Sequence, residues 1–578
     1  MRRGVAFVLT LIVLAVIVSV LAMATIFLVV GREPDVSANS ALVLRVRGDL
    51  AEAEPGGVVS QLIEAPPTLR STIDALRKAK VDRRVSSVVL VPGPTNGLWG
   101  QVQELREAIL DFRQSQKPIV AYLEYGGEQQ YYLASACDKV FLMPASPLDL
   151  SGLATYEVFF RGALDKLGVY PDLLHIGDYK TAANTFTEKA LTPAHREMAE
   201  SLTADLYEQL VRGIADGRDK EEADVRAIID RGPLLPEEAV ELGLVDDLAY
   251  EDQIDDKADL GGAGIRRLEN DRYRHVSLDS LGLNRGPRIA VIYAAGTIAT
   301  GRSSQDFGSQ VVGSETLIEY IRKARGDNSI RAIVLRVDSP GGSAIASDVI
   351  WREVTLTRDS KPVVSSMSDL AASGGYYIAM PAHVIVAQPG TLTGSIGVVM
   401  GKFAVGGALD KVGVGMSAVS RGTYAQIYSP SRPFSPAERA KVEEQMQATY
   451  DLFVEKAAES RQTTPEKIDA VAQGRVWTGQ QAKQLGLVDE LGGLQRALAI
   501  AKQRADIEPD TEVQLVIYPP RRSFYELVRN PFGESAGESG VLSFLRPGER
   551  RALLPLAAPW RLFESGEPLA LMPNVFLR

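Results

Sequence analysis

The sequence repeats itself at an almost constant spacing, and this internal duplication limits the folds that the chain can adopt. Ala163–Lys166 recurs as Ala408–Lys411, 245 positions later. The same offset relates further pairs without a gap: Tyr131-Tyr132 with Tyr376-Tyr377, Pro144 with Pro389, Gly152 with Gly397, Gly162 with Gly407, and Gly177-x-Tyr179 with Gly422-x-Tyr424. A closing motif, Leu242–Asp246, returns as Leu485–Asp489 at an offset of 243. The repeats predict two copies of one domain, which suits a chain of 578 residues because single cores stop growing at about 250 to 300 residues.

Each copy alternates β-rich segments with helical stretches, which is typical of an α/β domain. Residues 86–91 and 332–337 are β-rich, and Ser435-Pro436 marks the start of a predicted helix over 436–461. The predicted organisation is a stub and transmembrane anchor (1–31), a tether (32–39), a first repeat (40–260), a connector (261–287), a second repeat (288–506) and a C-terminal tail (507–578). We interpret the tail as an appendage, with contact to a membrane as one option.

The N-terminus predicts a membrane anchor. Arg2 and Arg3 precede an uncharged apolar run from Gly4 to Gly31, which as a helix is long enough to cross about 30 Å of hydrocarbon. The run is longer than the apolar core of a typical signal peptide, so an uncleaved anchor is favoured over a cleaved signal. The two arginines predict that the N-terminus lies in the cytoplasm and the bulk of the chain on the other side of the membrane.

Composition excludes several function classes. A net charge of −10 gives no basic surface for nucleic acid. One cysteine, Cys137, and four scattered histidines provide neither a disulfide framework nor a zinc-binding pattern. The sequence also lacks the phosphate-loop, zincin and dinucleotide-binding motifs. We therefore expect neither a metal nor an organic cofactor.

Two turns in the second copy could carry catalysis. The apolar strand 332–335 runs into Asp338–Ser343, whose glycines would let backbone N–H groups approach a ligand and form an oxyanion hole. The strand 362–367 leads into Ala371–Tyr377, where Ser373 stands among small residues at a predicted helix start. Taken alone, the first is better interpreted as a plain strand-to-helix turn and Ser373 as a helix N-cap.

The duplication links Ser373 to a lysine in the other copy. Ser373 aligns with Glu128, whereas Lys180 of the first copy aligns with Ala425. A serine hydroxyl needs a base, and a lysine that is desolvated can be neutral near physiological pH and act as that base. Complementary losses in the two copies favour a shared pair over an ordinary surface lysine.

Four motifs, GDYK in the first copy and SPGGS, AASGGYYIA and PGTLTGSIGV in the second, give the chain a family resemblance. Over residues 5–505 it resembles the long form of bacterial signal peptide peptidase A, also called protease IV. The resemblance implies a tandem Clp-protease/crotonase-like α/β fold, a Ser373/Lys180 dyad, and a membrane-facing homo-oligomer, expected to be a tetramer. It also implies that cleaved signal peptides and other short apolar peptides are the substrates.

The resemblance implies further site residues as well. Ser395, between two glycines, would orient Lys180, and its first-copy counterpart is Leu150. The N–H groups of Gly342 and Gly374 would form the oxyanion hole, as in Clp-type proteases. A plain turn serine remains the alternative for Ser395.

Three other functions compete with the protease. A crotonase-fold acyl enzyme needs carboxylates, and Glu128 lies in the copy without SPGG. A Ser/His/Asp hydrolase needs a placed histidine, and His383 follows Ser373 by only ten residues. A non-catalytic membrane scaffold is the third alternative.

Overall fold

A computed structural model describes Leu14, Ile17, Val18 and residues 33–52, 67–260, 264–306, 309–520, 567–573 and 576–577. Apart from Leu14, Ile17 and Val18, the predicted anchor over residues 1–31 lies outside the described residues. Among the described helices, none combines the length and the apolar character that a membrane span needs.

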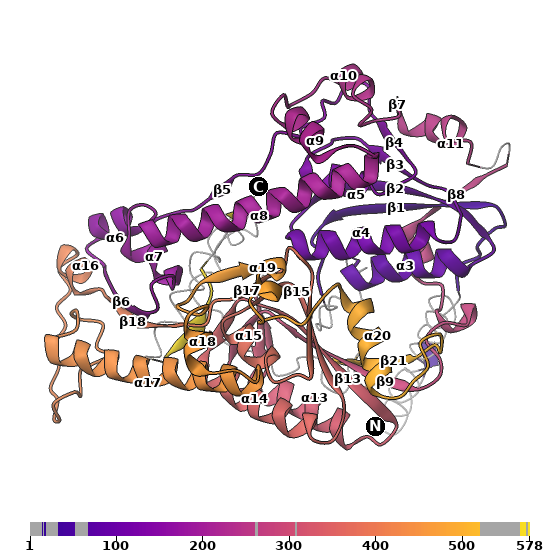
Figure 1. Ribbon diagram of the computed structural model, residues 1–578. Helices are drawn as coiled ribbons and strands as arrows, with labels where there is room; N and C mark the ends of the chain where they lie inside the picture. The colour runs from indigo at the N-terminus through magenta and orange to yellow at the C-terminus, as the bar shows by residue number, and fades with distance from the viewer. Residues whose placement is uncertain are drawn as a thin grey trace, which may run out of the picture.

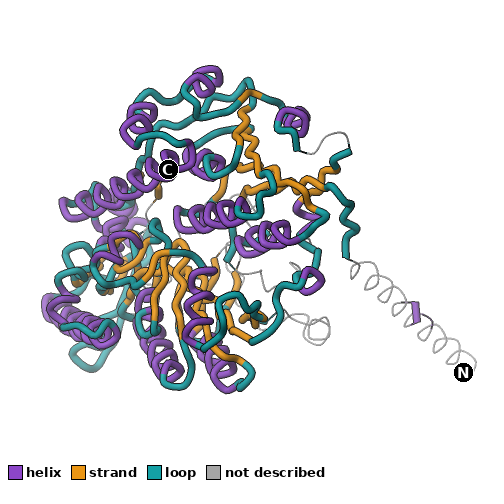
Figure 2. The backbone as a smooth tube through the Cα atoms, turned by 45° about the vertical axis from the view of Figure 1, so that its right-hand side comes forward, coloured by secondary structure: helices purple, strands orange, loops and turns teal. Residues whose placement is uncertain are grey.

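Each copy has its own sheet (Figures 1 and 2), and each sheet contains six parallel strands that follow one another in the same order. The first sheet has the order β7-β4-β3-β2-β1-β8: β1 (Ser40–Gly48), β2 (Val85–Thr95), β3 (Ile119–Leu123), β4 (Lys139–Leu142), β7 (Asp247–Leu248) and β8 (Arg266–Glu269). The second sheet has eight strands, six of which run parallel in the order β20-β16-β15-β13-β9-β21: β9 (Arg288–Ala295), β13 (Ile330–Ser339), β15 (Val363–Ala372), β16 (Val384–Ala387), β20 (Glu490–Leu491) and β21 (Gln514–Tyr518). Its other two strands, β17 (Leu392–Gly394) and β19 (Val476–Thr478), continue from the end of β15, and β19 runs antiparallel to β17. The predicted α/β class and the duplication are therefore confirmed.

The main helices follow one another in matching order along the two repeats. The first repeat contains α3 (Leu69–Val81), α4 (Trp99–Arg113), α5 (Glu128–Ala134), α6 (Arg161–Leu167), α8 (Pro193–Arg218), α9 (Glu222–Ile229) and α10 (Pro236–Glu241). The second contains α13 (Ser314–Gly326), α14 (Ala344–Arg358), α15 (Gly374–Ala379), α16 (Gly406–Lys411), α17 (Pro436–Ser460), α18 (Pro465–Asp469), α19 (Gly479–Gln484) and α20 (Leu494–Arg504). Each repeat has its own large apolar core.

The repeated closing motif has the same packing role in both copies. The hydroxyl of Tyr131 donates to the carbonyl of Leu244 at 2.7 Å, and that of Tyr376 donates to Leu487 at 3.1 Å. Both tyrosines are fully buried. A buried phenol needs a hydrogen-bond partner, and in each copy the closing motif supplies that partner to the buried tyrosine.

Two edge strands lie outside the limits predicted for the repeats. β8 falls in the segment expected to be a connector, and β21 in the segment expected to be a tail. Each nevertheless pairs in parallel with the first strand of its own repeat, β8 with β1 and β21 with β9. Both short strands are therefore edge strands of a repeat's sheet, not parts of a connector or of a tail.

A third sheet joins the two repeats. Its order is β11-β12-β10-β14-β22-β18-β6: β6 (Tyr170–Ile176), β10 (Thr297–Ala299), β11 (Ser304–Asp306), β12 (Ser309–Gly313), β14 (Gly341–Ser343), β18 (Val398–Ala404) and β22 (Leu569–Leu571). β6 of the first repeat runs antiparallel to β18 of the second along seven residue pairs. Helix α8 also reaches from the first repeat across β17 (Leu392–Gly394) and β19 (Val476–Thr478) of the second (Figure 1).

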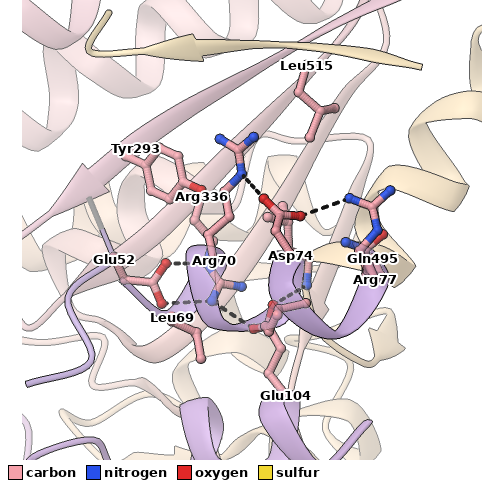
Figure 3. Close-up of a pocket in the computed structure, with 12 residues that line it drawn as sticks. Glu52, Leu69, Arg70, Asp74, Arg77, Glu104, Tyr293, Arg336, Gln495 and Leu515 are labelled. Carbon is pink, nitrogen blue, oxygen red and sulfur yellow. Dashed lines mark hydrogen bonds and ion pairs between the residues drawn. The ribbon is translucent and has the colours of Figure 1, made fainter. Parts of the chain in front are cut away.

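A buried ion cluster also connects the repeats (Figure 3). Arg336 on β13 is 1% exposed, and its guanidinium donates to Glu52 and to Glu104 of the first repeat. Burial opposes ionisation of Glu52, but the Arg336 charge and its hydrogen bonds lower the pKa of Glu52. Glu104 also accepts the N–H of Leu494 at the start of α20. Because removal of one partner would leave a buried charge unpaired, the cluster fixes how the repeats face each other.

Candidate active site

Ser373 lies in a strained turn between β15 and α15. Its φ and ψ are 56° and −112°, a region that residues with a side chain rarely adopt. Its N–H donates to the carbonyl of Gly394 at 2.7 Å, which holds the turn. Although Ser373 occupies the N-cap position of α15, its side chain makes no capping hydrogen bond. The helix-cap alternative therefore does not describe this serine.

The β6–β18 ladder carries Lys180 to the second repeat. Gly177 directly follows β6, and the next turn is fixed by the N–H of Tyr179, which donates to the carbonyl of Gln473 at 2.8 Å. A Cβ on Gly177 would lie 2.4 Å from the carbonyl carbon of Gln473, and one on Gly474 would lie 2.5 Å from Lys180 Cα. Two glycines therefore let the chain segments approach closely enough to place Lys180.

Lys180, Ser373 and Ser395 meet in the interior. Lys180 Nζ lies 2.7 Å from Ser373 Oγ, 2.8 Å from the carbonyl oxygen of Ser395 and 3.0 Å from Ser395 Oγ. Each of the three residues is 0% exposed. The structure thus brings together the predicted nucleophile Ser373, the predicted base Lys180 and Ser395, which the family resemblance implied as the residue that orients the lysine.

Burial sets the protonation state of the lysine. Desolvation lowers the pKa of Lys180 well below its ordinary value of 10.5, and no carboxylate among the described residues offsets this effect. A buried ammonium without an ion-pair partner is costly, so the neutral amine is favoured. A neutral amine at hydrogen-bond distance from a hydroxyl can accept its proton.

The two glycine turns lie against each other beside Ser373. Gly374 begins α15, and Gly342 lies in β14 with a φ of 150°. A Cβ on Gly341 would lie 2.7 Å from the backbone nitrogen of Gly374. The predicted oxyanion glycines therefore belong to touching segments, and Gly341 is a neighbour whose contact the sequence did not predict.

The geometry disfavours the competing catalytic groups. His383 Nδ1 accepts the N–H of Val363 at the start of β15, whereas Ser373 follows its end. Ten strand residues separate these positions, which corresponds to about 30 Å. In the first repeat, Glu128 Oε1 accepts the N–H of Ser151 at 3.1 Å. Neither residue faces Ser373 as a base.

The contacts of Lys180 with Gly474 and Gln473 could not be predicted from the sequence. Gly177 is repeated as Gly422, which does indicate a glycine-dependent turn in each copy. The partner of that turn lies almost 300 positions away, and the duplication carries no information about contacts between copies.

Among the described residues, no group of three or more His, Cys, Asp or Glu side chains could hold a metal ion.

Comparison with known proteins identifies the family. The model of "Peptidase family S49" matches residues 111–265 and 355–508, one segment in each repeat. The chain is 38% identical over 485 residues to "Serine protease SPPA, chloroplastic" of Arabidopsis thaliana, which covers 83% of this chain and 71% of the relative. It is 35% identical over 503 residues to "Protease 4" of Salmonella typhi, with 83% and 80% covered. It is 31% identical over 509 residues to "Protease 4" of Haemophilus influenzae, with 83% and 81% covered.

These matches confirm the resemblance that the four motifs predicted. The family model covers both copies, and the relatives align along most of the chain. The chain therefore belongs to peptidase family S49 and is a serine protease.

Proposed function

We propose that the protein is a membrane-bound endopeptidase that uses a Ser373/Lys180 dyad, formed across its two repeats, to degrade cleaved signal peptides. One observation carries the catalytic part: Lys180 Nζ lies 2.7 Å from Ser373 Oγ, and both residues are fully buried. A lysine in this position has lost the hydration that normally keeps it protonated.

Acylation begins when Ser373 Oγ attacks the carbonyl carbon of a peptide and its proton passes to Lys180 Nζ. The N–H groups of Gly342 and Gly374 stabilise the resulting oxyanion. The C–N bond then breaks, and Lys180 returns the proton to the departing amine. A water molecule, deprotonated by Lys180, attacks the acyl-enzyme ester; the ester C–O bond breaks, and Lys180 returns the proton to Ser373 Oγ as the second product leaves.

Ser395 has a positioning role in this scheme. Its carbonyl and hydroxyl oxygens both lie within hydrogen-bond distance of Lys180 Nζ. With two oxygens fixed on one side, the amine is oriented so that its lone pair can face the Ser373 hydroxyl. Ser395→Ala keeps the carbonyl contact and is expected to reduce the rate less than loss of Lys180.

The substrate class is supported by the surroundings of the dyad. Beside Ser373 lies a cluster of apolar residues from both repeats, which includes Met198, Leu202, Leu392 and Val476. These residues are buried, so the nucleophile has apolar rather than charged neighbours, which is in keeping with small or apolar peptide side chains in the substrate. The membrane location rests on the uncharged run from Gly4 to Gly31. The Clp-protease/crotonase-like topology and the homotetramer, both implied by the resemblance, remain predictions.

Hydrolysis of a short apolar peptide by purified variants tests the dyad. Ser373→Ala and Lys180→Met should each lower kcat by about 10⁴-fold or more, as loss of a nucleophile or base does in other hydrolases. Methionine keeps most of the buried volume that alanine would leave empty. Lys166→Met, at an exposed lysine, is the matched control and should be fully active. Activity of Lys180→Met near that of the wild type would contradict the proposal.

A further inference from the structure

Four side chains from the two repeats gather at the turn that carries Lys180. The guanidinium carbon of Arg475 lies 4.6 Å from the ring centre of Tyr179 and 4.5 Å from that of Trp477. Its Nη1 donates to Glu197 Oε1 at 2.7 Å, and the hydroxyl of Tyr179 donates to the other carboxylate oxygen at 3.0 Å. These four residues, called here the Arg475 cluster, join the start of α8 to β19 and the residue that precedes it.

The backbone at Arg475 holds both residues that contact the Lys180 amine in the proposed site. Its carbonyl accepts the N–H of Ser395 at 2.7 Å. The preceding residue, Gly474, packs so closely on the lysine that a Cβ there would lie 2.5 Å from Lys180 Cα. A shift of Arg475 would therefore move the lysine turn and Ser395 together.

Exposure falls stepwise from the Arg475 cluster to the dyad. The side chain of Glu197 is 57% exposed and that of Arg475 is 16% exposed, whereas Lys180 is 0% exposed. Because burial is what lowers the pKa of Lys180, the side chains that cover this turn determine how completely the amine is dehydrated.

The first repeat forms the equivalent turn without an arginine. Its bridge between Leu148 and Leu234 corresponds to the β17–β19 pairing of the second repeat. At the offset of 243, Gly232 stands at the position of Arg475. The fold of the turn therefore does not require an arginine side chain, and Arg475 occurs in the copy that packs on Lys180.

We propose that Arg475 is a positioning residue for the base: held by the two rings and by Glu197, its side chain shields the Lys180 turn from water and keeps the amine directed at Ser373. Arg475 acts through Lys180 and not on the peptide. Its loss should therefore change the fraction of neutral amine at a given pH. The inference rests on the proposed function, since it takes Lys180 as the base.

The pH dependence of Ser373 modification by a fluorophosphonate probe tests this role in the full-length protein. Arg475→Met keeps a long side chain but loses the guanidinium and its bond to Glu197. Water should then reach the amine and raise its pKa, so the midpoint of the rate should move up by about one pH unit. Below the midpoint the rate should fall about tenfold, and well above it the rate should approach that of the wild type. A midpoint equal to that of the wild type would overturn the proposal.

Glu197→Ala separates shielding from charge, and it carries the test if Arg475→Met does not fold, because Glu197 is exposed. Loss of the carboxylate releases both Arg475 and Tyr179, so shielding predicts a midpoint raised by about half a pH unit. A purely electrostatic influence predicts the opposite direction, because removal of a negative charge disfavours the ammonium form. A midpoint that falls or stays unchanged would overturn the shielding role.

Arg218→Met is the matched control. Arg218 is 10% exposed, pairs with Asp246 at 3.0 Å and ends α8, whereas Glu197 lies near the start of that helix. Its loss removes a comparable ion pair far from the lysine, so the midpoint should equal that of the wild type. An equal upward shift in this control would show that the effect is not specific to the dyad and would overturn the inference.

Lys180→Met distinguishes failure of this inference from failure of the proposed function. If Lys180→Met titrates like the wild type, the proposed function is refuted and the inference falls with it. If the titration disappears in Lys180→Met but Arg475→Met and Glu197→Ala keep the wild-type midpoint, the inference alone is refuted and the proposed function stands.

Discussion

Ser373 is held in a backbone conformation that suits glycine better than serine. Its φ of 56° and ψ of −112° are imposed by the Gly394 hydrogen bond on one side and by α15 on the other. Such strain costs about 1–3 kcal/mol and persists where surrounding structure fixes it. The turn directs the hydroxyl toward Lys180 instead of toward the helix N-terminus, which is the orientation that the proposed mechanism needs.

The strain predicts an order of stability among inactive variants. Ser373→Gly should be more stable than Ser373→Ala by about 1 kcal/mol in urea unfolding, because relief of the strained φ outweighs the greater unfolded-state entropy of glycine. Both variants lack the nucleophile, so activity is not a factor in the comparison. If Ser373→Ala were as stable as Ser373→Gly, the turn would not be strained in solution.

The sequence could predict the identity of these residues but not their geometry. Ser373 and Lys180 stood out because each aligns with a different residue in the other copy: Ser373 with Glu128, and Lys180 with Ala425. The backbone angles of Ser373 depend on Gly394, which belongs to a neighbouring strand. A local pattern of small residues favours a nucleophile turn and a helix cap alike, so it could not distinguish them.

At the scale of elements, the β6–β18 ladder determines where Lys180 lies. β6 enters the second repeat along seven pairs and ends at Ile176. Gly177, with a φ of 104°, then turns the chain against Gln473 so that Lys180 points to Ser373. Activity should therefore depend on that turn as well as on the dyad itself.

Gly177→Ala should lower kcat by about 100-fold, because the added Cβ would displace the lysine-bearing turn and small misplacements are costly to catalysis. Gly422→Ala is the matched control from the other copy. It has nearly the same φ, 100°, but the nearest neighbour of its Cβ would be 4.0 Å away. Steady-state kinetics should find this control close to the wild type. Equal losses in both variants would point to backbone strain rather than to crowding at the dyad.

Element-level prediction from the sequence failed for the shortest strands. Alternation of β-rich and helical segments predicted the two α/β repeats, because long periodic segments reflect local preferences. β22 spans only three residues, Leu569–Leu571, and its pairing partners lie about 170 to 230 positions earlier. Too short to give a periodic signal, it was placed in a tail that we interpreted as an appendage.

At the scale of the whole molecule, both residues of the proposed dyad come from one chain. The buried Arg336 cluster and the shared third sheet hold the repeats in a single arrangement, within which Lys180 reaches Ser373. A chain that lacks either residue therefore cannot be rescued by a neighbour that lacks the other.

Co-assembly tests this arrangement. Full-length Ser373→Ala and Lys180→Met chains, refolded together from a denatured mixture, should remain inactive at every mixing ratio. Wild-type chains refolded in the same way are the control for recovery of activity. Hydrolysis by the mixture at up to about a quarter of the control would indicate that the dyad forms between chains.

The measurement that tests the dyad most directly is the pH dependence of Ser373 modification by a fluorophosphonate probe. Because burial lowers the pKa of Lys180, the rate constant should rise as the lysine loses its proton and level off well below pH 10.5. In Lys180→Met the rate should be low throughout and show no such titration. A wild-type midpoint near 6.5, typical of histidine, or an unchanged profile in Lys180→Met would contradict the assignment of Lys180 as the base.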